Sequence, residues 1–103
     1  MYSQENIENI VSKFFALASK GIKINSIYLF GSYAKGNERE ESDIDLAIVS
    51  DEFEGSRFDD SRRLSKYVIE TSSDLEVHPF KTSDFNEGNP FVKEILKTGI
   101  RLV

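Results

Sequence analysis

Two segments decide the fold of this chain: Phe30-Gly31-Ser32-Tyr33-Ala34-Lys35-Gly36 and, after a short polar loop, Ser42-Asp43-Ile44-Asp45-Leu46. The first is typical of an apolar strand that runs into a Gly-Ser turn, and the second opens another strand with two carboxylates one residue apart. Side chains alternate between the faces of a strand, so Asp43 and Asp45 are expected on one face with their Cα atoms about 6.5 Å apart. This spacing suits two metal ions, or one ion that both carboxylates share.

The chemistry of such a pair requires a partner. Two ionised carboxylates about 6 Å apart repel by roughly 3 kcal/mol at an effective dielectric constant near 20, so a cation or a raised pKa is needed to hold them together. Magnesium is commonly held by one or two carboxylates together with substrate phosphates. Gly31 and Ser32 offer a phosphate a turn without a Cβ, backbone N–H groups and a hydroxyl. A phosphate site and a metal site are therefore predicted next to each other.

Length and composition limit what can surround this site. The 103 residues predict one domain with a modest core. The formal charge is −5 and the Lys and Arg residues are scattered, so a long nucleic acid is not the expected partner. The sequence contains no cysteine, which excludes disulfides and thiolate metal sites. It shows neither a membrane-spanning apolar run nor a signal sequence, so a cytoplasmic protein is the simplest expectation.

Hydrophobic periodicity predicts helices alternating with strands. In chain order these are a helix capped by Ser3 and ended by Gly21, a strand at 24–30, a helical turn at 32–35, a polar loop at 37–41, a strand at 43–49 covered on both faces, a helix at 59–71, a strand at 74–80, a helix capped by Asn89 with Pro90 first and Gly99 as stop, and a tail at 100–103 that could add an edge strand. Pro79 indicates that the third strand ends there or lies at an edge. Phe14, Phe15 and Phe91 are expected in the core. The fold class is α/β (α+β), a small mixed sheet with helices packed on it.

The two segments together resemble the signature of minimal nucleotidyltransferase (MNT) domains, small members of the DNA polymerase β-like nucleotidyltransferase superfamily that are paired with HEPN-domain proteins. The motif covers 30–46, and the element order extends the resemblance over most of the chain. The resemblance implies one MNT domain over residues 1–103, with a palm-like sheet. It also implies that Gly31 and Ser32 bind nucleotide phosphates and that Asp43 and Asp45 bind metal. Many members carry Arg where Lys35 stands, so Lys35 is either a phosphate contact or a solvated lysine.

The resemblance also implies a third carboxylate from a later strand. Glu76 matches this position best because Leu75 and Val77 flank it, and Asp74, on the same face by alternation, is the alternative. His78 is the only histidine of the chain. It is either a group that orients an acceptor or moves a proton, or an ordinary hydrogen-bonded histidine at a strand edge.

The function that the resemblance implies is Mg²⁺-dependent transfer of a nucleoside monophosphate, in the first instance AMP from ATP, to a hydroxyl acceptor with release of pyrophosphate. Asp43, Asp45 and Glu76 would be the catalytic and metal-binding residues, with two ions when nucleotide is bound. Gly31, Ser32 and Lys35 would bind the nucleotide. The acceptor would lie on a HEPN-type partner bound in trans, as for MNT antitoxins of toxin–antitoxin pairs, and a homo- or hetero-oligomer is compatible with this.

One alternative stays open: a non-catalytic, antitoxin-like module that neutralises a partner by stoichiometric contact and keeps a vestigial or sensing nucleotide site. A solvated strand entry would also account for alternating acids, although the Gly-Ser turn upstream makes it the weaker interpretation. A calcium-binding loop is disfavoured because Asp43 and Asp45 lack the following glycine and the distal glutamate of that motif.

Overall fold

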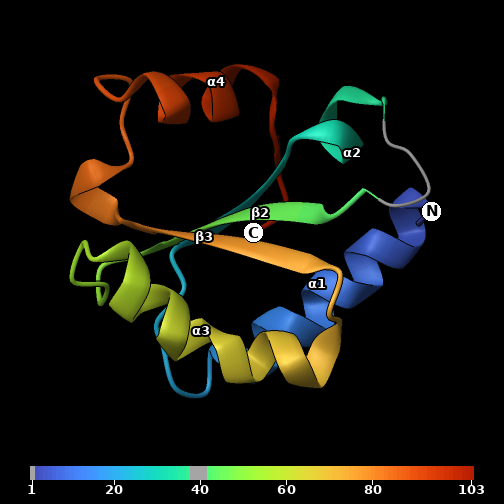
Figure 1. The fold of residues 1–103 in the computed structure, drawn as a ribbon, viewed down its shortest axis with the longest axis horizontal. Coiled ribbons are helices and arrows are strands. Elements are labelled where there is room, and N and C mark those ends of the chain that lie inside the picture. The colour runs from blue at the N-terminus through green and yellow to red at the C-terminus, as the bar shows by residue number, and fades with distance from the viewer. Residues whose placement is uncertain (1, 38–41) are drawn as a thin grey trace.

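The computed structural model describes residues 2–37 and 42–103, so positions 38–41 of the predicted polar loop lie outside the described residues. Helices and strands alternate along the chain as predicted (Figure 1). In order they are α1 (Gln4–Ala18), β1 (Ser26–Phe30), α2 (Ser32–Lys35), β2 (Ile44–Ser50), α3 (Arg57–Thr71), β3 (Leu75–Lys81), the 3₁₀ turn η1 (Thr82–Asp84), α4 (Pro90–Thr98) and β4 (Ile100–Arg101).

Within the described residues the strands form one four-stranded sheet with the order β3-β2-β1-β4. β1 is antiparallel to both β2 and β4, whereas β2 and β3 are parallel, so the predicted mixed sheet is confirmed. The tail strand β4 lies at one edge beside β1. β3 lies at the other edge, where the missing N–H of Pro79 is tolerated, and the ladder continues past it to Lys81.

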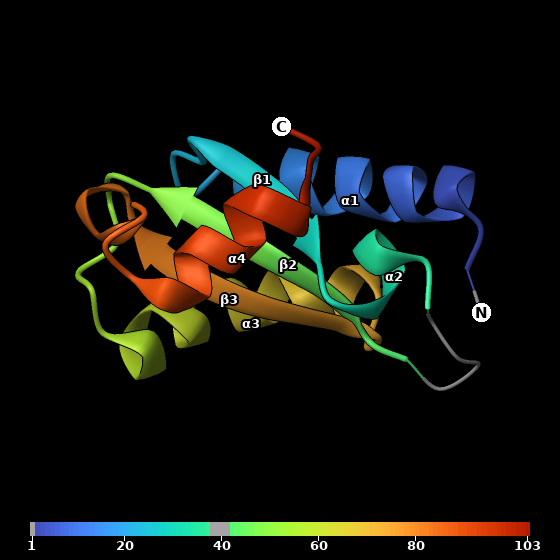
Figure 2. The same ribbon diagram turned by 90° about the horizontal axis from the view of Figure 1, so that it is seen from above.

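The helices cover the two faces of the sheet unequally. α1 and α3 lie together on one face, and the shorter α2 and α4 lie on the other (Figures 1 and 2). The core fills the space under the long pair, where Phe14 of α1 and Leu64 of α3 are fully buried against the sheet. All residues of β2 are buried except the half-buried Asp45, so the expectation that both faces of this strand are covered is confirmed. No helix in the described part of the chain has the length and apolarity to cross a membrane.

Side-chain caps explain where the helices begin. Ser3 accepts a hydrogen bond from Asn6 N at 3.1 Å, as predicted, and Asn89 accepts one from Phe91 N at 2.9 Å. Ser56 caps α3 by accepting from Asp59 N at 3.3 Å, so this helix begins two residues before the predicted start. α1 ends at Ala18, before the predicted stop at Gly21.

The expectation that Phe91 belongs to the core is wrong. Phe91 is 45% exposed, whereas Phe14 is fully buried and Phe15 is half-buried against the core. α4 buries Val92 and Ile95 instead. The helical repeat then places Phe91 at the flank of the buried face, where its ring borders the functional region described next.

Candidate active site

The Gly-Ser turn lies directly beside Asp45. β1 ends at Phe30, which is paired with Asp45 of β2, and Gly31 then turns the chain into α2 with φ 74° and ψ −150°. This backbone conformation is one that residues with a Cβ rarely adopt. A Cβ at Gly31 would also overlap Asp45 Oδ2 and come within 3.2 Å of Asp45 Cγ. Two separate requirements, the conformation and the close approach, therefore select glycine here.

Strand register brings the second carboxylate to the same place. Asp45 on β2 is the direct partner of Glu76 on the parallel strand β3, and their side chains are 23% and 51% exposed. Partial burial raises the pKa of Asp45, and the negative charge of Glu76 raises it further, while His78 acts in the opposite direction. The pair is thus a site that favours bound positive charge.

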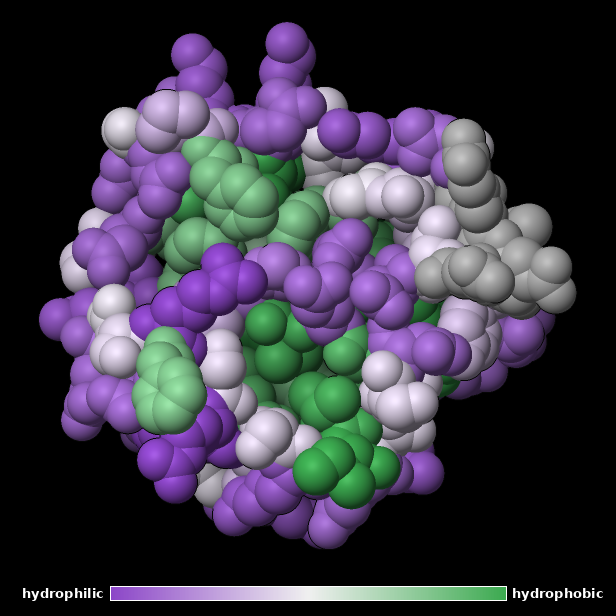
Figure 3. Space-filling view, in the orientation of Figure 1, coloured by the Kyte–Doolittle hydropathy of each residue, from purple (hydrophilic) through white to green (hydrophobic). Residues whose placement is uncertain are grey.

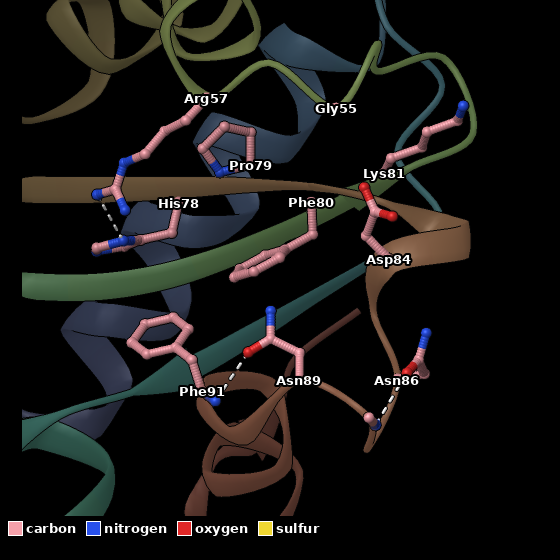
Figure 4. Close-up of a pocket in the computed structure, with 11 residues that line it drawn as sticks. Gly55, Arg57, His78, Pro79, Phe80, Lys81, Asp84, Asn86, Asn89 and Phe91 are labelled. Atoms are coloured by element: carbon pink, nitrogen blue, oxygen red, sulfur yellow. Dashed lines mark hydrogen bonds between the residues drawn. The ribbon is translucent and has the colours of Figure 1, made fainter.

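His78 joins these two carboxylates from the same face of β3. Its Nε2 lies 3.5 Å from Asp45 Oδ1 and 3.9 Å from Glu76 Oε1. Its Nδ1 lies 3.1 Å from Nη2 of Arg57, the first residue of α3 (Figure 4). One ligand atom from each of Asp45, Glu76 and His78 lies within 4.8 Å of the others, and among the described residues this is the group whose geometry could hold a metal ion.

The two remaining acidic candidates lie elsewhere in this structure. Asp43 precedes β2 by one residue, is exposed and is not part of the described group of converging ligand atoms. Asp74 precedes β3, and its carboxylate accepts a hydrogen bond from the Tyr2 hydroxyl. Glu76, not Asp74, is therefore the carboxylate beside Asp45, although its catalytic role stays a prediction.

Ser32 and Lys35, at the two ends of α2, differ in burial and in their contacts. Ser32 is the first residue of α2 and is half-buried next to the turn. Lys35 ends α2, with its side chain 46% exposed and its Nζ 3.7 Å from Glu94 Oε1 on α4. An exposed ion pair of this kind is worth roughly 0–1 kcal/mol, so Lys35 can leave Glu94 for a phosphate at little cost.

A cavity of about 690 Å³ opens beside this group. Its lining comes from the start of α3, from β3 and from the segment that leads into α4, with the rings of Phe80 and Phe91 and the amide of Asn89 facing it (Figure 4). Figure 3 shows apolar side chains gathered between α4 and β3, above a hydrophilic band along β3. Phe30 packs edge-on against His78 at 4.9 Å and against Phe91 at 5.6 Å, which connects the cavity to the Gly-Ser turn.

The sequence alone does not assign Arg57, Phe80 or Asn89 to this region. No local pattern marks them, because they meet only when α3 and α4 pack on opposite sides of β3. Phe91 carries a misleading signal, since its helical spacing with apolar neighbours is the pattern of a core residue.

Comparison with known proteins supports this description of the fold. The family described as "Polymerase beta, Nucleotidyltransferase" matches residues 5–103. A protein of Methanocaldococcus jannaschii named "Putative protein adenylyltransferase" is 33% identical over 97 residues, which is 94% of each chain. A second protein of that organism with the same description is 33% identical over 109 residues, covering 97% of this chain and 73% of the relative.

Two solved structures share the fold. The crystal structure of a protein described as a nucleotidyltransferase from Sulfolobus solfataricus aligns with a TM-score of 0.72 at 18% identity, over 95% of this chain and 80% of the other. A toxin–antitoxin complex with AMP-PNP aligns with a TM-score of 0.59 at 23% identity, over 93% and 72%. The family match over nearly all of the sequence, together with the relative that is aligned over 94% of both chains, shows that this chain belongs to the polymerase β nucleotidyltransferase family.

Proposed function

We propose that this chain is a Mg²⁺-dependent nucleotidyltransferase that moves AMP from ATP to a hydroxyl of a partner protein. The observation that carries the proposal is that strand register puts Glu76 beside Asp45, at the end of β1 where Gly31 turns the chain. The names of the relatives refer to protein adenylyltransferases, which supports both AMP as the group and protein as the acceptor.

The residues present fit a magnesium ion. Asp45 and Glu76 offer hard oxygen ligands, and the raised pKa of Asp45, caused first by burial and then by Glu76, is the response expected of carboxylates that face each other without a cation. Asp43, exposed just before β2, would have to turn its carboxylate toward this pair to add a third ligand. When bound, magnesium would neutralise the triphosphate and lower the pKa of the acceptor hydroxyl.

The chain's own residues would bind and orient the reactants. Backbone N–H groups at Gly31 and the Ser32 hydroxyl would hold the β- and γ-phosphates, with Lys35 released from Glu94 to join them. The acceptor oxygen would attack the α-phosphorus as the bond to the pyrophosphate oxygen breaks, and Glu76, half-exposed at the sheet edge, would accept the hydroxyl proton. Positioning and charge neutralisation would supply most of the rate.

The cavity beside this group offers room for the nucleoside. The exposed ring of Phe91 provides a face on which a base can stack, and such stacking is worth roughly 1–3 kcal/mol. The Asn89 side chain caps α4 through its oxygen, which leaves its NH₂ group facing the cavity (Figure 4). An amide donor beside an aromatic ring suits a purine.

The acceptor would be supplied in trans by a HEPN-type partner. Some solved structures with this fold are toxin–antitoxin complexes, one of them with the nucleotide analogue AMP-PNP. The alternative is a non-catalytic antitoxin-like module that neutralises its partner by contact alone. The exposure of Asp43, outside the converging group, is the observation that favours this alternative.

A label-transfer experiment distinguishes the nucleotidyltransferase from the non-catalytic binding module. The chain is incubated with its co-purifying partner, Mg²⁺ and either [α-³²P]ATP or [γ-³²P]ATP. The proposal expects label on the partner from the α-labelled nucleotide only, and its loss in Asp45→Asn. Asp51→Asn is the matched control, because Asp51 is exposed and bonded to Asn25 at the far end of β2. No label transfer in Mg²⁺ or Mn²⁺, with Asp45→Asn still neutralising the partner, would support the binding module instead.

A further inference from the structure

His78 carries an unusual buried atom. The residue is 9% exposed, and its Nε2 is a buried polar atom without a hydrogen-bond partner among the described residues. The nearest polar atoms are carboxylate oxygens, Asp45 Oδ1 at 3.5 Å and Glu76 Oε1 at 3.9 Å. Leaving a buried donor or acceptor unpaired costs free energy, so an orphan atom aimed at two carboxylates calls for an explanation.

Arg57 determines which nitrogen of the ring carries the proton. A guanidinium group only donates hydrogen bonds, so the 3.1 Å contact from Arg57 Nη2 requires Nδ1 of His78 to accept (Figure 4). A neutral imidazole that accepts at Nδ1 carries its proton on Nε2. The atom that faces Asp45 is therefore an N–H donor.

This tautomer conflicts with a role in metal binding. A histidine ligand must offer a lone pair to the ion, and moving the proton from Nε2 to Nδ1 would set an N–H against the donating Arg57. Although ligand atoms of Asp45, Glu76 and His78 converge within 4.8 Å, only the two carboxylates present lone pairs. The geometric cluster of three thus contains two ligands and one donor.

We propose that His78 is a positioning residue: held by Arg57 with its proton on Nε2, it turns that N–H toward Asp45 Oδ1, 3.5 Å away, and orients the carboxylate electrostatically without touching the ion. The two oxygens of Asp45 then have separate partners, since Oδ1 faces His78 and Oδ2 faces the Gly31 turn, where nucleotide and metal would bind. Phe30, in edge contact with the imidazole, keeps the ring in place. The orienting role rests on the proposed function, but the tautomer does not.

Nitrogen NMR tests the tautomer directly, because the chain has a single histidine. A long-range ¹H–¹⁵N correlation spectrum of the ¹⁵N-histidine-labelled chain at neutral pH should show an unprotonated Nδ1 and a protonated Nε2. The pattern should persist when Mg²⁺ and ATP are added. A protonated Nδ1 in the free protein, or a proton that leaves Nε2 when the ion binds, would overturn the proposal.

Arginine variants test the cause of the tautomer. Arg57→Leu should convert the spectrum to a mixture of both tautomers. Arg62→Leu, on the same helix with its guanidinium over the Phe58 ring, removes the same charge away from His78 and should leave the spectrum unchanged. A wild-type spectrum in Arg57→Leu would overturn the role assigned to Arg57.

Mn²⁺ binding, followed by electron paramagnetic resonance, tests the orienting role. His78→Leu should bind Mn²⁺ about 10–100-fold more weakly, the loss typical of groups that orient metal ligands. His78→Gln, whose amide NH₂ can replace the Nε2 donor, should restore most of the affinity. Equal losses in both variants would contradict positioning. Failure of the wild type to bind Mn²⁺, with or without ATP, would overturn the proposed function and the orienting role, while the metal-free spectrum would still decide the tautomer.

Discussion

At the scale of single residues, Gly31 combines the backbone and the chemistry of the site. Its positive φ ends β1 sharply, and its lack of a Cβ lets Asp45 approach the turn. Gly36, at the other end of α2, has nearly the same φ of 73°, but a Cβ added there would meet no atom within 4 Å. Gly36 therefore carries only a backbone cost, whereas Gly31 combines a less accessible backbone conformation, with ψ of −150°, and the crowding of the carboxylate.

We expect Gly31→Ala to lower the free energy of unfolding by more than Gly36→Ala. The left-handed backbone at Gly36 costs alanine roughly 1–2 kcal/mol. Gly31, with ψ of −150°, lies in a region that is essentially restricted to glycine and costs about 1–3 kcal/mol, and only Gly31→Ala must also displace Asp45. Urea denaturation measures the free energy of unfolding of both variants. Gly31→Ala should in addition abolish ATP binding, whereas Gly36→Ala should retain it; equal stability losses with ATP binding intact in both would contradict the packing of Asp45 on the turn.

Asp45 should also make the metal-free protein less stable as the pH rises. Burial, followed by the charge of Glu76, raises the pKa of this carboxyl above its value in the unfolded chain, which is about 3.9. Between the two pKa values the folded state binds more protons, so the free energy of unfolding contributed by Asp45 falls as the pH increases through this interval.

Asp45→Asn removes that penalty. In the presence of a chelator, the free energy of unfolding of Asp45→Asn relative to wild type should increase from acid to neutral pH. Urea denaturation at several pH values across this range measures it. Added Mg²⁺ should reverse the order by stabilising only the wild type. An Asp45→Asn protein that is less stable than wild type in chelator at neutral pH would show that the carboxylate pair is not strained without a cation.

At the scale of elements, much of the fold could be predicted from the sequence. The caps at Ser3 and Asn89, the turn into α2 and the edge position of β3 each rest on a local signal, and the structure contains them all. The register of β2 against β3 could not be read from either strand alone, although it is what pairs Asp45 with Glu76. For the same reason Arg57 could not be connected with His78, since their contact depends on how α3 crosses the sheet edge.

The packing of α4 on the sheet leads to a prediction about the nucleoside. Phe91→Ala should weaken ATP binding while leaving inorganic triphosphate binding unchanged, because only the base would contact the ring. Phe58→Ala is the control, since Phe58 is 71% exposed on α3 and lies outside the cavity lining. Isothermal titration calorimetry gives both affinities. If Phe91→Ala weakened the binding of ATP and of triphosphate equally, Phe91 would act on the phosphate site. If neither affinity changed, the base would not bind in this cavity.

At the scale of the whole molecule, one face of the sheet supplies most of the core and the other carries the site. α1 and α3 bury the core (Figure 1). On the other face a polar band follows β3, and the cavity lies between β3 and the start of α4 (Figure 3). Because β3 is an edge strand, Glu76 and the cavity face a side of the molecule that no other strand of the described sheet covers. This is the side from which the proposed protein acceptor would approach.

The central claim is that Asp45 and Glu76 form the carboxylate pair that supports AMP transfer, and one comparison of rates tests it most directly. The rate of transfer from [α-³²P]ATP to the partner is measured for Glu76→Gln and for Asp74→Asn, the second at the acidic residue just before β3 whose carboxylate is bonded to Tyr2. We predict that Glu76→Gln lowers the rate by about 100-fold or more while Asp74→Asn stays close to wild type. A Glu76→Gln rate equal to wild type, or the large loss in Asp74→Asn instead, would contradict the account.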